Sequence, residues 1–378
     1  MAQTLARMTR HPQGTNDPSS SRGWTRGAWD GFAEPAAAAT LGAVKVMLTG
    51  ATGFVGSHTF AALAAAGHRV RALVRSRGKL ERVLERLELD PAHHEVVVGD
   101  MTDAAAVGEA LDGCDAVVHA AAVLYGGEEV YRANVAGAVH TLGAARERGL
   151  DPILYVSTIA AMYPPPGDVI TVDDPIVNLH TTYGRSKAEN ERLARSLQAE
   201  GAPVVTIYPA GVYGPEDPAM GETTKGLRDG IRLAMPVTET GISIVDVRDL
   251  AKMIVVALEP GRGPRRYMAG GLFMTWSELA DHLDNLTGRR VRRISAAPRV
   301  LRGMARALDL AKRVVPFEYP LTHEAALMMT RFVPCDSRKA QEELGVKFRP
   351  TEATLGDSIR WLYEKGELDA KHVPRLVR

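Results

Sequence analysis

The chain has 378 residues, of which 45% are hydrophobic and 24% charged, and its formal net charge is +1. This length allows a sizeable core, and we expect one large domain with an appended lobe. A nearly neutral chain has no overall field that attracts nucleic acid, and no apolar run approaches the roughly 18–20 residues that span a bilayer. The two cysteines cannot form a disulfide framework, which favours a reducing cytoplasm.

Residues 1–42 differ in composition from the rest of the chain. They contain three consecutive serines, scattered Gly and Pro, and no apolar periodicity. This composition predicts a disordered leader. A gene start placed too early, with translation beginning near Val44, would give the same pattern. Neither interpretation assigns the leader a function.

From Val44 onward, short Val- and Ile-rich runs alternate with helical stretches. We predict strands at residues 44–49, 69–74, 96–99, 116–120, 153–157 and 204–208, and helices at 53–66, 104–111, 134–148 and 183–199. Short continuous apolar runs are typical of a parallel sheet that is covered on both faces. The alternation predicts right-handed crossovers and an α/β fold with a doubly wound parallel sheet of the Rossmann type.

The alternation fades after about Gly211. A strand at 242–247 and a helix at 249–258 are expected to return to the core, and helices follow at 276–286, 301–314, 337–344 and 353–365. We therefore expect a nucleotide-binding domain made of residues 43–210 and 242–270. Residues 211–241 and 271–378 would form a smaller substrate-binding lobe over the carboxyl edge of the sheet.

A glycine-rich turn follows the first predicted strand directly, in the sequence Gly50-Ala51-Thr52-Gly53-Phe54-Val55-Gly56. Gly50 permits a tight turn, Gly53 lets the backbone approach a phosphate, and Gly56 lets the helix pack closely against the strand. The pyrophosphate of a dinucleotide would then sit at the helix N-terminus, where free N–H groups and the helix dipole favour anions.

The residues after the second predicted strand indicate the choice of cofactor. Arg75 follows the strand directly, and no carboxylate appears before Glu81. A cofactor with a free ribose 2′-hydroxyl would favour Asp or Glu at this place. A guanidinium instead matches a 2′-phosphate in charge and geometry. We therefore expect NADP, with NAD possible; the alternative is that Arg75 is only a solvated loop cation.

Three further segments are expected near the cofactor. Asp100-Met101 follows the third strand and fits the adenine edge, and residues 120–122 have small side chains that let the backbone approach. Asn134 stands at the start of the next predicted helix, where a helix cap is the alternative role.

Tyr183 and Lys187 are candidate catalytic residues, because a four-residue spacing puts both side chains on one helix face. An ammonium beside a phenol favours the phenolate and lowers the phenol pKa from about 10. Such a tyrosine can protonate the oxygen formed when hydride reaches a carbonyl carbon. The hydroxyls of Ser157 and Thr158, at the end of a predicted strand, can bind the same oxygen or only cap the strand.

Together these segments resemble an extended short-chain dehydrogenase/reductase of the NAD-dependent epimerase/dehydratase group, with dihydroflavonol-reductase-like relatives. The resemblance covers about residues 44–365 and is carried by residues 49–56, 119–122, Asn134, Ser157, Thr158, Tyr183, Lys187, 208–215, 245–250 and 336–345.

The resemblance implies roles for single residues. Tyr183 would be the acid/base, Lys187 would lower its pKa and hold the nicotinamide ribose, and Thr158 would orient the substrate oxygen beside Ser157. A homodimer built on helices 134–148 and 183–199 is also implied. The complete set of expected cofactor contacts is Gly50, Thr52, Gly53, Phe54, Val55, Gly56, Arg75, Asp100, Met101, Ala120, Ala121, Ala122, Asn134, Tyr183, Lys187, Pro209 and Val212.

Departures from the family pattern bear on the substrate. Tyr208 stands where sugar-nucleotide members usually carry Arg, and Thr158 is followed by Ile159 and Ala160 rather than by the carboxylates of dehydratases. These features favour a smaller or more apolar carbonyl compound. We expect an NADP-dependent oxidoreductase that reduces a ketone or aldehyde or oxidises a secondary alcohol, without a metal.

Two alternatives remain open. One is an NAD-dependent nucleotide-sugar epimerase or dehydratase, and the other is a non-catalytic NADP(H)-sensing protein. The Tyr183–Lys187 pair argues against the sensor.

An arginine-rich stretch lies in the second half of the chain, at Arg289, Arg290, Arg292, Arg293, Arg299 and Arg302. We expect a solvated edge of the smaller lobe. Contact with a membrane surface or an anionic substrate is the alternative.

Overall fold

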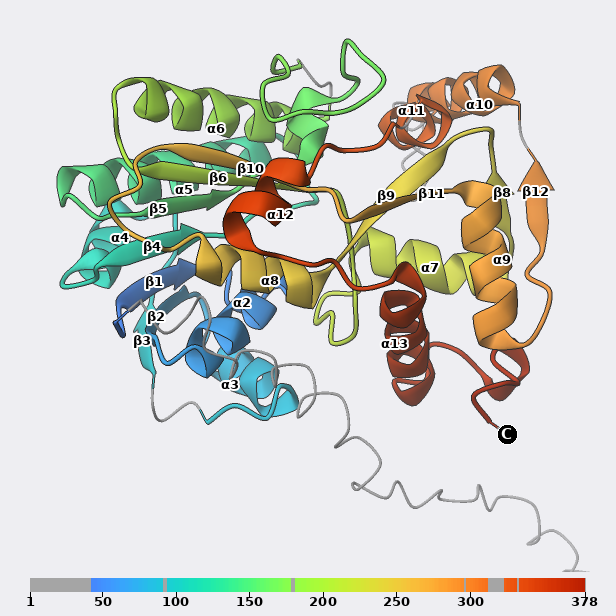
Figure 1. The fold of residues 1–378 in the computed structure, drawn as a ribbon, viewed down its shortest axis with the longest axis horizontal. Helices are drawn as coiled ribbons and strands as arrows, with labels where there is room; N and C mark the ends of the chain where they lie inside the picture. The colour runs from blue at the N-terminus through green and yellow to red at the C-terminus, as the bar shows by residue number, and fades with distance from the viewer. Residues whose placement is uncertain are drawn as a thin grey trace, which may run out of the picture.

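The fold consists of a large parallel sheet covered by helices and a smaller lobe beside it (Figure 1). The computed structural model describes residues 42–90, 94–177, 181–295, 297–311, 323–331 and 333–377. The expected leader lies outside these residues except for Gly42.

The central sheet has seven strands in the order β10-β6-β5-β4-β1-β2-β3, and every neighbouring pair is parallel. The strands are β1 (Lys45–Thr49), β2 (Arg69–Val74), β3 (Glu95–Val98), β4 (Ala116–His119), β5 (Ile153–Val156), β6 (Val204–Pro209) and β10 (Arg265–Ala269). The doubly wound fold predicted from the sequence is confirmed. The edge strand β10 was not predicted, because its Arg-Arg-Tyr start lacks a continuous apolar run.

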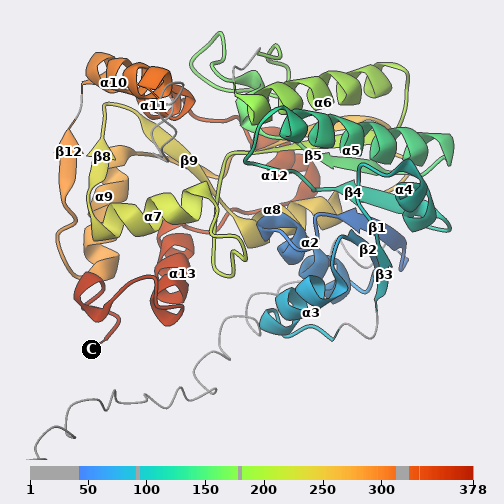
Figure 2. The ribbon, with the colours of Figure 1, turned by 180° about the vertical axis from the view of Figure 1, so that it is seen from behind.

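Helices cover both faces of this sheet (Figures 1 and 2). One face carries α2 (Phe54–Ala65), α3 (Arg77–Arg86), α8 (Val247–Val256) and α12 (Arg338–Leu344), and the other carries α4 (Ala104–Leu111), α5 (Glu128–Glu147) and α6 (Thr182–Ala199). A separate apolar cluster of strand and helix side chains fills each interface. Two details differ from the prediction: α3 was not expected, and α5 begins at Glu128 rather than at Asn134.

The smaller lobe contains a three-stranded sheet in which β9 (Gly241–Asp246) lies between β7 (Gly211–Tyr213) and β11 (Leu272–Thr275). The other elements of this part of the chain are β8 (Met235–Val237), β12 (Arg293–Ser295), α7 (Glu222–Arg232), α9 (Trp276–Thr287), α10 (Pro298–Ala311), α11 (His323–Arg331), α13 (Thr351–Glu364) and the 3-10 turn η6 (Ala370–His372). A second 3-10 turn, η5 (Ile159–Met162), follows β5 of the central sheet. We expected all of 242–270 in the nucleotide-binding domain, but β9 pairs within this second sheet, and only α8 and β10 join the central one.

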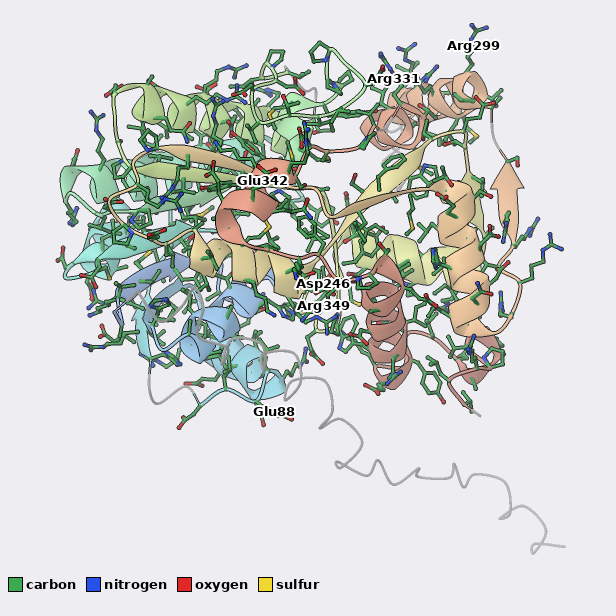
Figure 3. All side chains as sticks on the ribbon, in the orientation of Figure 1. Glu88, Asp246, Arg299, Arg331, Glu342 and Arg349 are labelled. Carbon is green, nitrogen blue, oxygen red and sulfur yellow. The ribbon has the colours of Figure 1, made fainter. Side chains whose placement is uncertain are left out.

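A buried ionic network connects the end of β9 with α8 and α13. Asp246 is 3% exposed and accepts hydrogen bonds from the Arg248 guanidinium and from the Thr354 hydroxyl on α13. Arg248 also pairs with Asp357 at 2.7 Å. Nearby, Arg349 pairs with Asp249 of α8, and Figure 3 shows Asp246 and Arg349 between α8 and α13. The network therefore fixes α13 against α8, and α8 packs on α2.

Asp246→Asn tests this network. Burial alone would raise the pKa of Asp246, but the hydrogen bonds and charge of Arg248, helped by Arg349, lower it below its usual 3.8. We expect the substitution to lower the free energy of unfolding by about 3 kcal/mol at pH 7, measured by urea denaturation. The wild-type advantage should persist above about pH 4 and disappear only as the pH falls through the lower, folded pKa.

The matched control is Glu259→Gln, which breaks a half-exposed pair with Arg262 and should cost about 1 kcal/mol or less. Equal losses in the two variants would show that the buried network has no special role.

Candidate active site

The glycine turn after β1 is packed backbone against backbone. Gly50 has a φ of +80°, and a Cβ built there would lie 2.7 Å from the backbone nitrogen of Ala121 beyond β4. A Cβ on Gly56 would overlap the carbonyl oxygen of Gly50. Because these neighbours are backbone atoms that cannot rotate away, both positions exclude any side chain. The turn therefore holds β1, α2 and β4 in close contact.

The start of α2, directly after Gly53, fits a different task, that of receiving an anion. The Gly53 N–H itself donates to the Gly50 carbonyl at 2.8 Å, and no side chain caps the N–H groups that follow. The first turn of α2 carries no acidic residue, so its N–H groups and dipole present positive potential. Such a helix start fits the pyrophosphate of a dinucleotide, with Thr52, Phe54 and Val55 in the same segment.

The end of β4 is fixed next to this turn by Thr49, the last residue of β1. The Thr49 hydroxyl accepts a hydrogen bond from the Ala121 N–H and lies 2.9 Å from Nδ1 of His119. Burial, together with the charge of Lys187, lowers the pKa of His119 to about 3, so its ring is neutral at physiological pH. Ala120 and Ala121 are thereby held beside Gly50.

Asn134 lies inside α5, six residues after its start, and so does not cap the helix. Its side chain accepts from the Val123 N–H at 2.8 Å and donates to the Val123 carbonyl at 2.9 Å. The same amide donates to the Ser186 hydroxyl on α6 at 3.1 Å. Asn134 therefore fixes the segment after β4 to the helix that carries Tyr183.

Tyr183 and Lys187 lie together on α6, as their spacing predicted. The Nζ atom of Lys187 is 5.9 Å from the centroid of the Tyr183 ring and 5.1 Å from that of Tyr155. Lys187 also donates a hydrogen bond to the carbonyl of Val156, the last residue of β5, at 3.1 Å. The ammonium is therefore held between the sheet and the two rings.

The protonation states differ from the prediction. Burial raises the pKa of Tyr183, and the charge of Glu222 raises it further. Burial also lowers the pKa of Lys187 to about 8, although Glu191 opposes this shift. The net direction is therefore opposite to the one expected from Lys187, because burial raises the pKa of the phenol in the protein alone. The phenol keeps its proton at neutral pH.

Ser157 and Thr158 face different surroundings. The Ser157 hydroxyl is buried and donates to the carboxylate of Glu191 at 2.9 Å. The Thr158 hydroxyl oxygen accepts from the Ala160 N–H at 3.2 Å, at the start of η5, which leaves its O–H free to donate. Of the two predicted catalytic hydroxyls, Thr158 is thus the better placed to bind a substrate oxygen.

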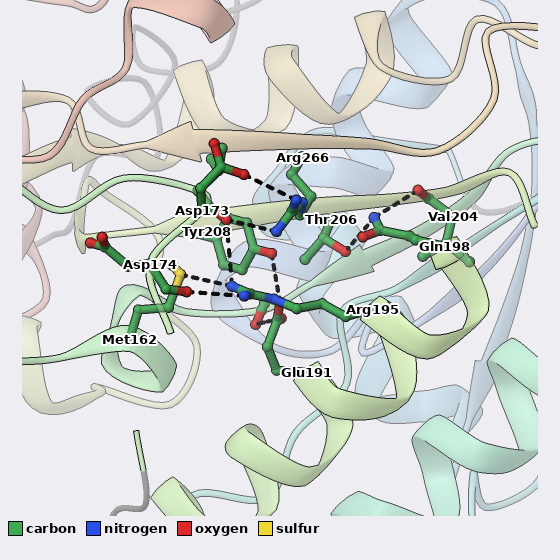
Figure 4. Close-up of polar contacts among 12 residues, drawn as sticks. Met162, Asp173, Asp174, Glu191, Arg195, Gln198, Val204, Thr206, Tyr208 and Arg266 are labelled. Atoms are coloured by element: carbon green, nitrogen blue, oxygen red, sulfur yellow. Dashed lines mark hydrogen bonds and ion pairs between the residues drawn. The ribbon is translucent and has the colours of Figure 1, made fainter. Parts of the chain in front are cut away.

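Glu191 was missed in the sequence and is the centre of the buried network in Figure 4. Its carboxylate is fully buried and accepts from Ser157, from the Tyr208 hydroxyl at 2.6 Å and from Arg195 at 2.8 Å. Burial, followed by the nearby charge of Glu191, raises the pKa of Tyr208. The available signal was the spacing, because Glu191 follows Lys187 by four residues as Lys187 follows Tyr183.

The remaining predicted contacts also lie toward the carboxyl ends of the sheet strands. Arg75 is exposed directly after β2, and Asp100 accepts from the N–H and hydroxyl of Thr102 after β3. Met101 packs against Gly137 of α5. Pro209 ends β6, and Val212 lies in β7. This edge is where open parallel sheets bind ligands.

A family model described as the NAD dependent epimerase/dehydratase family matches residues 46–270. The chain belongs to this family. It is therefore an NAD(P)-dependent enzyme of the extended short-chain dehydrogenase/reductase type, as the sequence motifs predicted. Family membership also argues against the alternative of a non-catalytic sensor.

Known proteins that resemble this chain align with it over most of its length. "Sterol demethylase protein B" of Methylococcus capsulatus is 27% identical and aligns over 85% of this chain and 99% of its own. "Putative dihydroflavonol 4-reductase" of Synechocystis is 28% identical, with 84% and 94% covered. The crystal structure of gox2253 is 27% identical, covers 86% of this chain and 99% of its own, and has a TM-score of 0.72.

Ser157→Ala and Thr158→Val separate the two hydroxyls. We expect Ser157→Ala to cost about 1–2 kcal/mol of folding free energy, because a buried carboxylate loses one donor, and to change kcat less than tenfold. Thr158→Val should lower kcat about a hundredfold, because it removes a donor to the reacting oxygen, and should cost about 1 kcal/mol of stability through loss of the bond to the Ala160 N–H. Urea denaturation and the absorbance of reduced cofactor give the two readouts. A hundredfold loss of kcat in a stable Ser157→Ala variant would contradict this division.

Proposed function

We propose that this enzyme is an NADP-dependent oxidoreductase that reduces a ketone or aldehyde, or oxidises a secondary alcohol, with Tyr183 as its acid/base. The observation that carries the proposal is the placement of a protonated, half-buried phenol beside Lys187, at the sheet edge that also carries the glycine turn.

The side chains can perform the proton transfer of such a reaction. When bound, the nicotinamide cofactor supplies the hydride that reaches the carbonyl carbon. Tyr183 then gives its phenolic proton to the carbonyl oxygen, and Thr158 hydrogen-bonds the same oxygen. Lys187, held by the Val156 carbonyl, stabilises the phenolate that remains. The reverse sequence takes a proton from an alcohol.

Two neighbouring features support NADP as the cofactor. Arg75 is exposed at the end of β2, and Ser76 caps the N-terminus of α3 by accepting from the Lys79 N–H. The first turn of α3 contains Arg77 and no acidic residue. A 2′-phosphate at this place would meet a guanidinium and the positive end of a helix dipole.

The substrate is best described as a small or apolar carbonyl compound. Tyr208, at the position where sugar-nucleotide members of the family usually carry Arg, is fully buried and bonded to Glu191. It therefore offers no cation for a substrate diphosphate. The Synechocystis relative carries a reductase name, which agrees with this class of substrate.

Tyr183→Phe tests the acid/base role. We expect kcat to fall by about 10²–10⁴-fold, because the proton donor is lost while the ring and its packing remain. Cofactor affinity, measured by fluorescence titration, should change little. Near-normal turnover in this variant would refute the role, whichever carbonyl substrate a screen identifies.

Arg75→Ala tests the cofactor preference. Loss of a charge-assisted bond to the 2′-phosphate should weaken NADPH binding about tenfold or more and leave NADH binding nearly unchanged. Arg69→Ala, which removes an exposed arginine at the opposite end of the same strand, is the matched control. Equal losses for the two cofactors in Arg75→Ala would contradict the assignment of NADP.

A further inference from the structure

The arginine-rich stretch predicted from the sequence divides into two groups in the structure. Arg289 donates to the carbonyl of Ile231, Arg293 pairs with Asp281 and Asp284, and Arg302 donates to Thr330. These arginines hold the smaller lobe together. Arg299 is exposed on α10, and Figure 3 shows it extending away from the ribbon.

α10 is unusual because its outward face is apolar. Val300, Met304 and Leu310 are 64%, 47% and 63% exposed, and Ala307 between them is exposed as well. Their spacing of three or four residues places them along one side of the helix. The opposite side packs inward through Leu301 and Ala305, against Ala326 of α11. Exposed aliphatic side chains on one helix, beside an already buried face, mark an interaction surface.

Positive charge borders this outward face. Arg299 and Arg306 are exposed and seven residues apart, so they lie along one edge of the apolar face. The 14-residue sequence of α10 contains three arginines and one acidic residue. An apolar helix face edged by arginine is the pattern of helices that lie in the interface of an anionic bilayer.

We propose that α10 docks the protein peripherally on an anionic membrane surface, with Val300, Met304 and Leu310 among the acyl chains and Arg299 and Arg306 against lipid phosphates. α10 has fewer residues than the roughly 20 needed to cross a bilayer, and none of the helices in the described part of the chain is long and apolar enough to do so. The helix therefore lies in the plane of the membrane surface.

The charge of the face favours lipid over a second copy of this chain. A two-fold symmetric dimer through α10 would bring the arginines of one copy close to those of the other, which is unfavourable. A bilayer that contains anionic headgroups supplies the opposite charge and the apolar phase together.

The position of α10 connects such docking to the candidate active site. α10 packs on α11, and the Leu327 carbonyl of α11 accepts a hydrogen bond from Tyr163 at 3.0 Å. Tyr163 follows η5, the turn that Thr158 begins. Met329 of α11 also accepts from Thr240 in the smaller lobe. A bilayer at α10 would thus lie against the α10–α11 pair, and α11 contacts both Tyr163 after η5 and Thr240 in the smaller lobe.

Vesicle co-sedimentation of the full chain tests this proposal independently of activity. We expect binding to vesicles that contain phosphatidylglycerol, little binding to pure phosphatidylcholine vesicles, and weakening with added salt. Arg299→Gln with Arg306→Gln should weaken binding about tenfold or more, at about a fivefold loss per arginine. Val300→Ser with Met304→Ser should weaken it by at least about tenfold, because two side chains no longer enter the acyl region.

The matched control is Val98→Ser on β3, where Val98 is 59% exposed on the far strand of the central sheet. This variant should bind vesicles as the wild type does, and all variants should keep the wild-type melting temperature because the changed side chains are exposed. Absence of wild-type binding to the anionic vesicles would overturn the proposal, as would unchanged binding by the Val300/Met304 variant. A wild-type dimer that the Val300/Met304 variant converts to monomer would also overturn it, by assigning the face to self-association.

Discussion

The site depends on a close contact between three backbone segments, the turn after β1, the start of α2 and the end of β4. Side chains are excluded at Gly50 and Gly56, because a Cβ at either position would meet backbone atoms. The same contact directs the N–H groups at the start of α2 toward the edge of the sheet where β4 and β5 also end. A binding place for an anion and the candidate catalytic side chains are thus brought to one edge by packing alone.

The second constraint is the burial of one face of α6. Tyr183, Lys187 and Glu191 follow one another at four-residue spacing; Lys187 and Glu191 are buried and bond to Val156 and Ser157 at the end of β5, and Tyr183 is half-buried beside Lys187. Burial keeps the proton on the phenol and lowers the pKa of the ammonium to about 8, while Glu191 compensates part of the loss of water. Positive charge beside the phenol is therefore maintained by buried partners rather than by solvent. In this arrangement Tyr208 and Ser157 donate hydrogen bonds to the Glu191 carboxylate.

Much of the fold could be predicted from the sequence, because local pattern and chain order determine it. The apolar runs of β1, β4 and β5 are continuous, and the glycine turn and the Tyr183–Lys187 spacing are short motifs. The strand β10 and the helix α3 were missed because charged residues interrupt their patterns. The pairing of β9 depends on β7 and β11, and a pairing between segments far apart in the sequence is not contained in either segment's own pattern.

The finer features of the site depend on tertiary contacts that no local pattern contains. Whether Ser157 or Thr158 faces a ligand is decided by the distant carboxylate of Glu191. The pKa of Tyr183 follows from its burial, which the sequence could not supply, so the expected direction of its shift was wrong. The role of Asn134 likewise depends on hydrogen bonds to Val123 and Ser186, not on a position at a helix end.

The most direct measurement is a crystal structure of the enzyme with NADP and an unreactive ketone analogue. Our account predicts that the Tyr183 hydroxyl lies about 2.6–3.2 Å from the analogue's oxygen, with the pyrophosphate at the start of α2. A Tyr183 hydroxyl turned away from that oxygen, or a cofactor bound away from the glycine turn, would contradict it.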